Sequence, residues 1–204
     1  MINCQIDTKE IDKFDKKNYN HIYGELTYDG IKTIINMVID HTKTSNLKNF
    51  TFYDLGCGSA NTLKYACELA NFKKLIGIEF SKTRYNIAIN NITNNCNVEL
   101  INNDILSPKI KYNKPKSVLY ISNLCFSDNI NVKLARKLSK ELKNNSIIFT
   151  SKLLPITISH KLINIKLHQT WNTNSNSYMY IINKTSKKTK KYKRSYKNNK
   201  TQKR

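Results

Sequence analysis

The chain has 204 residues, 39% of them hydrophobic, which suits one domain of ordinary size with its own buried core. Lys and Arg number 35 against 14 Asp and Glu, so the formal charge of +21 points to a polyanionic partner or compartment. No run approaches the roughly 18 apolar residues that cross a bilayer, and the N-terminus lacks a basic stretch followed by an apolar one, so we expect neither a membrane span nor secretion.

Cysteine and histidine usage disfavours disulfides and metal sites. The cysteines are odd in number and form no C-x-x-C pair: Cys4, Cys57, Cys67, Cys96 and Cys125. The four histidines are scattered. We therefore expect reduced thiols in a reducing compartment and no bound metal.

Strand-like and helix-like segments alternate in the first half of the chain. Residues 1–20 are polar without a clear period. After them the apolar spacing predicts, in order, a helix over 31–39, a buried strand over 50–55 that ends in a glycine turn, a helix over 63–70, a strand over 75–79, a helix over 85–92 and a strand over 98–101.

The second half continues this alternation and then changes. A strand is predicted over 117–121, a helix over 132–142 and a strand over 146–150, followed by two β-type runs at 163–167 and 178–182. Strands that alternate with helices are typical of an α/β fold. We expect a mostly parallel sheet with helices on both faces.

The last tenth of the chain carries more than half of the excess charge. Residues 184–204 contain eleven Lys or Arg and no acid, which leaves +10 for the rest. Tyr192 and Tyr196 are their only apolar residues, so we expect a disordered tail, serving either solubility and nuclear import or binding to nucleic acid. The predicted organisation is a short segment at 1–20, one domain at 21–183 and this tail.

Acidic residues and glycines meet at the predicted strand ends. Asp54, Gly56 and Gly58 end the first strand, Glu79 ends the second, and Asp104 follows the third. Glycines let a ligand approach the backbone closely, and an acid at the tip of the second strand can accept hydrogen bonds from ribose hydroxyls. An acid after the third strand can read the adenine edge. The pattern predicts an adenosine-containing ligand.

The identity of that ligand depends on the glycine turn. A flavodoxin-like or dehydrogenase fold with another nucleotide is the alternative. However, Ala60 and Asn61 stand where a dinucleotide fingerprint has its third glycine. Without a turn that binds pyrophosphate, S-adenosylmethionine is the better candidate.

Segments in the first half resemble a known family. Residues 22–28, 52–58 and 76–79 are similar to motifs of the Dot-one (disruptor of telomeric silencing) histone-lysine methyltransferases. The resemblance implies a class I methyltransferase fold, which is Rossmann-like and has an antiparallel edge on its mostly parallel sheet.

Matches continue in the same order in the second half. Residues 121–126 are similar to the family's V-N-N-F-x-F segment, and 150–152 to its S-[SL]-K segment. Trp171 and Tyr178 are similar to its S-W-x(6)-Y ending. The resemblance spans roughly residues 23–182.

Carried over by position, the resemblance implies a set of residues that bind S-adenosylmethionine. It puts Tyr23 and Glu25 in a loop that covers the cofactor, the two glycines against the methionine part, one acid on the ribose and another near the adenine. The whole cofactor set is Tyr23, Glu25, Asp54, Gly56, Gly58, Asn61, Glu79 and Asp104.

The resemblance also implies an acceptor channel. Methylation needs the neutral amine of a lysine whose ordinary pKa is about 10.4, and an apolar channel favours that form. Its candidate walls are Phe126, Trp171 and Tyr178, with Asn123 and Ser122 orienting the amine. The alternative is that these aromatic residues belong to the core.

Three functions from different classes follow. The resemblance implies a histone-lysine methyltransferase that acts on a nucleosome, on the globular face of histone three, as a monomer in the nucleus or on intracellular chromatin, with residues 184–204 on DNA. The fold alone also allows a methyltransferase for RNA, DNA or a non-histone protein. A non-catalytic nucleic-acid binder on this scaffold is the third, because Ser122 replaces a family asparagine.

Overall fold

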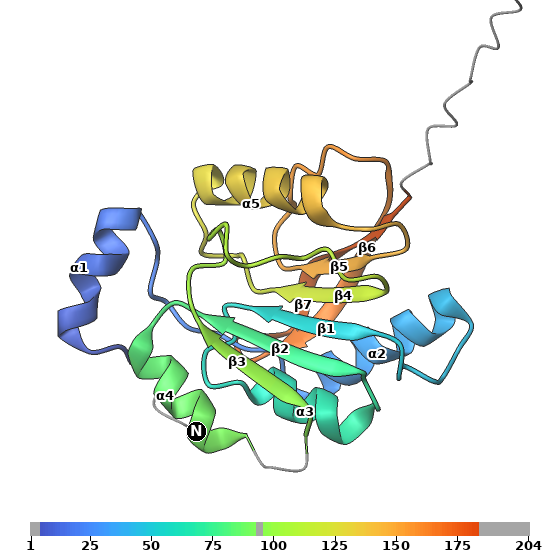
Figure 1. Cartoon of the computed structure of the whole chain (residues 1–204), viewed down its shortest axis with the longest axis horizontal. Coiled ribbons are helices and arrows are strands. Elements are labelled where there is room, and N and C mark those ends of the chain that lie inside the picture. The colour runs from blue at the N-terminus through green and yellow to red at the C-terminus, as the bar shows by residue number, and fades with distance from the viewer. Residues whose placement is uncertain (1–4, 93–95, 184–204) are drawn as a thin grey trace, which may run out of the picture.

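A computed structural model describes residues 5–92 and 96–183 (Figure 1). Its helices are α1 (Thr8–Lys17), α2 (Tyr28–Thr42), α3 (Asn61–Leu69), α4 (Lys82–Asn91) and α5 (Asp128–Glu141). Its strands are β1 (Thr51–Leu55), β2 (Lys74–Glu79), β3 (Val98–Asn102), β4 (Ser117–Ile121), β5 (Ile147–Thr150), β6 (His160–Gln169) and β7 (Asn172–Ile182). The predicted basic tail lies outside the described residues.

The strands form one mixed sheet in the order β3-β2-β1-β4-β5-β7-β6. The first five strands of the chain pair in parallel, whereas β7 pairs antiparallel with both β5 and β6. This confirms the predicted class I methyltransferase architecture, antiparallel edge included. The order in which strands join the sheet reverses between β1 and β4, and the crevice at this switch point is where such sheets bind ligands.

Helices cover both faces of the sheet, as predicted. Side chains of α2 and α3 pack with Phe52, Val118 and Phe149 in one buried cluster. Leucines of α5 pack with Leu119 and Ile148 on the opposite face. Figure 1 shows α5 on one side of the sheet and α2 and α3 on the other. The strands between these layers are almost fully buried, which explains their continuous apolar runs.

Residues 1–20 contain a helix that the sequence pattern did not predict. α1 begins after Asp7, whose side chain caps the backbone N–H of Lys9 at 2.9 Å. Few of its residues are apolar, and Phe14 alone among them is a buried hydrophobic residue. Its position depends on contacts with α4: the Glu10 carboxylate accepts hydrogen bonds from the hydroxyl of Ser81 and the N–H of Lys82.

The prediction that no disulfide forms is wrong for one pair. Cys67, in α3, is bonded to Cys96, just before β3. The two residues are 29 positions apart and meet only because α3 and the approach to β3 lie on neighbouring parts of the fold. Cys57 and Cys125 are free thiols.

No helix among the described residues is long and apolar enough to span a membrane.

Candidate functional site

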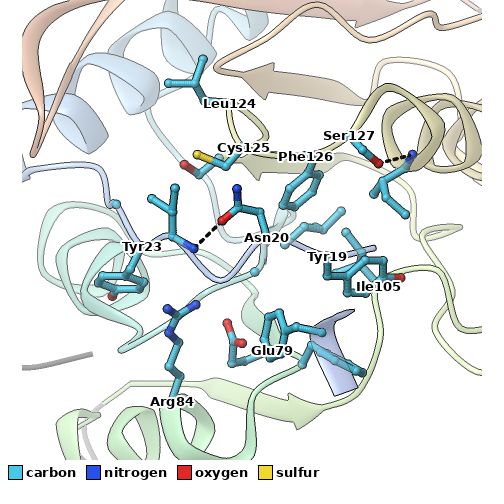
Figure 2. Close-up of a pocket in the computed structure, with 18 of the residues that line it drawn as sticks. Tyr19, Asn20, Tyr23, Glu79, Arg84, Ile105, Leu124, Cys125, Phe126 and Ser127 are labelled. Carbon is cyan, nitrogen blue, oxygen red and sulfur yellow. Dashed lines mark hydrogen bonds between the residues drawn. The ribbon is translucent and has the colours of Figure 1, made fainter. Parts of the chain in front are cut away.

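A cavity of about 250 Å³ opens at the carboxyl ends of β1, β2 and β4 (Figure 2). Its lining combines predicted site residues with residues from the N-terminal segment. The lining residues that the sequence singled out are Tyr23, Gly56, Glu79, Ser122, Phe126 and Trp171. Other residues of the lining were not among the predicted site residues. They include Phe14, Tyr19, Asn20, Phe80, Arg84, Ile105 and Leu124.

The turn after β1 has a backbone that requires glycine. Gly56 and Gly58 have φ values of 85° and 54°. A Cβ on Gly58 would lie 2.1 Å from the ring of Tyr23, so a side chain cannot fit there. Gly58 thus lets the loop that carries Tyr23 close directly over the turn.

Glu79 ends β2, and its carboxylate points into the cavity in Figure 2. Its two oxygens accept hydrogen bonds from the backbone N–H of Gly58 at 2.9 Å and of Ser81 at 2.8 Å. These bonds fix the carboxylate and leave it free lone pairs for ligand hydroxyls. The arrangement suits the predicted contact with a ribose.

A polar network joins the covering loop to the glycine turn. The Tyr23 hydroxyl accepts from the N–H of Ser59 at 3.0 Å and donates to its hydroxyl. Glu25 accepts from the Ser59 hydroxyl and from the Asn61 amide. Neither Glu25 nor Asn61 lines the cavity, so the network positions Tyr23 and the turn.

Three carboxylates, those of Asp54, Glu25 and Glu79, lie around this turn. Burial raises the pKa of Asp54 well above its usual range, and the charges of Glu25 and Glu79 raise it further. Burial also raises the pKa of Glu25 and of Glu79, although hydrogen bonds to each carboxylate oppose that rise. A ligand with fixed positive charge would stabilise the ionised forms of all three groups.

The raised pKa values predict that the affinity for S-adenosylmethionine increases with pH. The sulfonium and ammonium of this cofactor favour ionised carboxylates, so binding lowers their pKa values and releases protons. Ordinary carboxyl groups titrate near pH 4, so the increase in affinity should lie above that pH. The affinity should level off once all three carboxylates are ionised. S-adenosylhomocysteine, which lacks the sulfonium charge, is the matched control and should show a weaker dependence. Calorimetry in buffers of different ionisation enthalpy measures the proton release, and equal pH dependence for both ligands would contradict this account.

α1 and the segment after it close one side of the cavity. Lys17 forms an ion pair with Asp104 at 2.7 Å, and the Tyr19 hydroxyl lies 2.9 Å from both oxygens of the same carboxylate. Asp104 therefore anchors this segment and does not line the cavity; its neighbour Ile105 does. The prediction for Asp104 was a contact with adenine. The structure assigns its carboxylate to the protein's own side chains.

The cavity mouth is apolar. Ile22, Leu124 and Trp171 line it and are 65%, 50% and 41% exposed. Trp171 packs against Gly24, where a Cβ would lie 2.2 Å from the indole ring. Phe126 and Ser122 lie on the same cavity, from the end of β4 onward. These residues form a mostly apolar entrance with the hydroxyl of Ser122.

Two residues predicted for the acceptor channel lie outside the cavity lining. Asn123 is 0% exposed, and its amide bonds to Asn131, to the N–H of Ser151 and to both backbone groups of Lys152. Tyr178, on β7, packs against the hydrophobic cluster beneath α5. Both residues support the end of the sheet from within the fold.

Asn123→Ala should therefore destabilise the fold. The change leaves buried N–H and C=O groups without partners, at a cost of about 1–3 kcal/mol each. We expect the thermal midpoint to fall by several degrees. At temperatures below that midpoint, the cofactor affinity should be unchanged. An unchanged midpoint with activity abolished would instead assign Asn123 to the reaction.

Arg84 is a wall residue that sequence reasoning missed. Its guanidinium lies over the Tyr23 ring, 4.9 Å from the centroid, and donates to the carbonyl of His21. It also counters the rise in the pKa of Glu79. A basic residue five positions after the acid at a strand tip could have been noticed as a partner for it.

The fold is found in solved methyltransferases of low sequence identity. An RNA methyltransferase from Salinibacter ruber in complex with S-adenosyl-L-homocysteine is 15% identical over 77% of this chain and 95% of that chain, with a TM-score of 0.54. A candidate S-adenosyl-L-methionine-dependent methyltransferase from Methanococcus maripaludis is 13% identical over 87% and 93%, with a TM-score of 0.56.

A further match is partial. The plantazolicin methyltransferase BpumL in complex with SAH is 23% identical over 70% of this chain, with a TM-score of 0.49, and the chain spans about half of that protein, 51%. No curated protein matches the chain. A family model described as "Histone methylation protein DOT1" matches residues 3–200.

Proposed function

The chain belongs to the DOT1 histone methylation family, and from this premise we propose that it methylates a lysine of a core histone within the nucleosome. The family and the fold make it a methyltransferase that uses S-adenosylmethionine. The observation that carries the finer proposal is the family match over residues 3–200, which covers the cofactor end and the apolar mouth of one cavity.

The cofactor fits the cavity by chemistry. Glu79 presents a fixed carboxylate for ribose hydroxyls, and Phe80 and Ile105 offer apolar surface for the adenine. Of the three carboxylates near the glycine turn, Glu79 lines the cavity, and its negative charge also favours the cationic methionine part. When bound, the cofactor supplies an electrophilic methyl group.

The apolar mouth suits a lysine that must lose its proton. A solvated ammonium titrates about three units above neutral pH, so the site must offset roughly 4 kcal/mol. Ile22, Leu124 and Trp171 make the charged form costly by excluding water, and the walls align the amine with the methyl group. The Ser122 hydroxyl can accept a hydrogen bond from the amine.

Chromatin is the setting that the family favours, and we propose that residues 184–204 hold DNA there. Eleven basic residues without an acid would neutralise phosphates and release counterions. Such binding carries no sequence preference.

Transfer of a labelled methyl group to four substrates side by side tests the proposal: nucleosomes, free core histones, RNA and DNA. We expect label on histone, with nucleosomes the best substrate. Label on RNA or DNA alone would replace the proposal with a nucleic-acid methyltransferase. Cofactor binding without label on any substrate would favour a non-catalytic module.

A further inference from the structure

α5 exposes a stripe of one charge sign. Between residues 130 and 141 its exposed positions are Lys133, Arg136 and Lys140. The spacing of three and then four residues puts them on one side of the helix, along about 10 Å. The acid in this stretch, Glu141, is half-buried and paired with Lys137 at 2.8 Å.

A second basic segment lies beside this stripe. The Lys137 ammonium donates to the carbonyl of Ile110 at 2.7 Å, and the N–H of Tyr112 donates to Glu141 at 2.9 Å. These bonds hold residues 109–114 along α5. Their exposed lysines extend the stripe, and together they make the α5 basic face: Lys109, Lys111, Lys114, Lys133, Arg136 and Lys140.

The positive charge of this face does not simply reflect the high overall content of Lys and Arg. The sequence from 105 to 127 contains no acid. In α1, by contrast, lysines alternate with Asp12 and Asp15, so that helix carries mixed charge. Asp128 begins α5 and pairs with Lys152, and after it the helix exposes no acid. The exposed cations of this part of α5 therefore create a local positive potential.

We propose that the α5 basic face binds the phosphate backbone of duplex DNA without reading its sequence. A membrane-surface helix would expose apolar residues beside its cations, whereas Leu134 and Leu138 of α5 are buried. Single-stranded nucleic acid stacks on exposed aromatic rings, and Tyr112, the aromatic residue of the adjoining segment, is buried. Rigidly placed cations without either feature complement duplex phosphates.

The face lies between the cavity and the end of the described chain. Ile130 lines the cavity, and Lys133 lies one helical turn further along α5. After α5, the N–H of Asn145 donates to the carbonyl of Ile182 at 2.8 Å, close to where the basic residues 184–204 begin in the sequence. In Figure 1, α5 forms the outer layer on its side of the sheet. DNA on this face would hold a nucleosomal substrate beside the cavity mouth, and only this consequence depends on the proposed function.

The test compares two triple variants of the full chain, both with residues 184–204 intact. Lys133→Gln/Arg136→Gln/Lys140→Gln removes three charges from the α5 basic face. Lys32→Gln/Lys48→Gln/Lys73→Gln removes three exposed charges from α2 and from the connections into β1 and β2, and is the control. Because both variants lose three positive charges, a difference between their affinities for DNA depends on where the charges lie. The readout is the dissociation constant of a fluorescent DNA duplex at several salt concentrations.

We expect the α5 variant to bind DNA about ten-fold or more weakly at low salt and to reduce the logarithmic salt slope by about 2 to 3 units, with the control near the unaltered protein. Equal losses in both variants would overturn the proposal, as would tighter binding of double-stranded RNA than of DNA by the unaltered protein. Thermal midpoints and S-adenosylhomocysteine affinity confirm folding. The charge-preserving Lys133→Arg/Lys140→Arg variant should retain binding, and its loss would also contradict the proposal.

Discussion

Glu79→Ala should leave a less stable but folded protein whose affinity for S-adenosylmethionine is weaker by about a hundred-fold or more. The change removes a carboxylate that the N–H groups of Gly58 and Ser81 hold in the cavity. Hydrogen bonds from ligand hydroxyls to a charged acceptor contribute about 1.5–3 kcal/mol each, and a ribose can make two. Calorimetric titration with the cofactor measures the loss.

Glu99→Ala is the matched control for that experiment. Glu99 lies on the neighbouring strand β3, outside the cavity, in an exposed ion pair with Lys74. Its removal should leave cofactor affinity unchanged. If the two alanine variants bind the cofactor equally well, Glu79 does not hold the ribose and the cofactor has been assigned to the wrong part of the fold.

Phe126→Ala and Trp171→Ala should reduce turnover by about ten-fold to a hundred-fold while changing cofactor affinity much less. Both side chains line the cavity, and their loss admits water to the acceptor amine, which keeps its proton and its freedom to misalign. Steady-state rates on nucleosomes, together with the cofactor dissociation constant, separate these effects.

Tyr178→Phe provides the contrast. The sequence resemblance assigned Tyr178 to the acceptor channel, but in the structure this side chain packs beneath α5. We therefore expect nearly full turnover from this variant. A large loss in Tyr178→Phe, with Phe126→Ala fully active, would move the acceptor channel to the β7 side of the cavity.

The sheet could be predicted from the sequence because its strands are buried on both faces. Residues 50–55 and 117–121 are mostly apolar for that reason, and Gly56 and Gly58 mark the carboxyl end of the first of these strands. The sequence therefore predicts Glu79 at a strand tip, and in the structure it ends β2 and lines the cavity.

Contacts between distant segments could not be predicted in this way. α1 has little apolar periodicity. Its position depends on the contact of its Glu10 with the start of α4 and on the ion pair of its Lys17 with Asp104 beyond β3. The bond between Cys67 and Cys96 likewise depends on packing, since spacing alone gives no sign of it.

The sequence also could not show which way the side chains after β4 point. Asn123 and Ser122 are neighbours at the end of β4, but successive residues of an extended chain point to opposite sides. Ser122 faces the cavity, and Asn123 faces the interior, where it ties the ends of β4 and β5 together. A motif that places both at a reaction centre cannot distinguish these two environments.

The most direct test of the central claim is to locate the transferred methyl group. Nucleosomes are incubated with the full chain and S-adenosylmethionine, and their histones are fragmented and sequenced by mass spectrometry. The account predicts methyl groups on the side-chain nitrogen of a histone lysine, present with the unaltered protein and absent with Glu79→Ala. Histones without added methyl groups, under conditions in which calorimetry finds the cofactor bound, would contradict it.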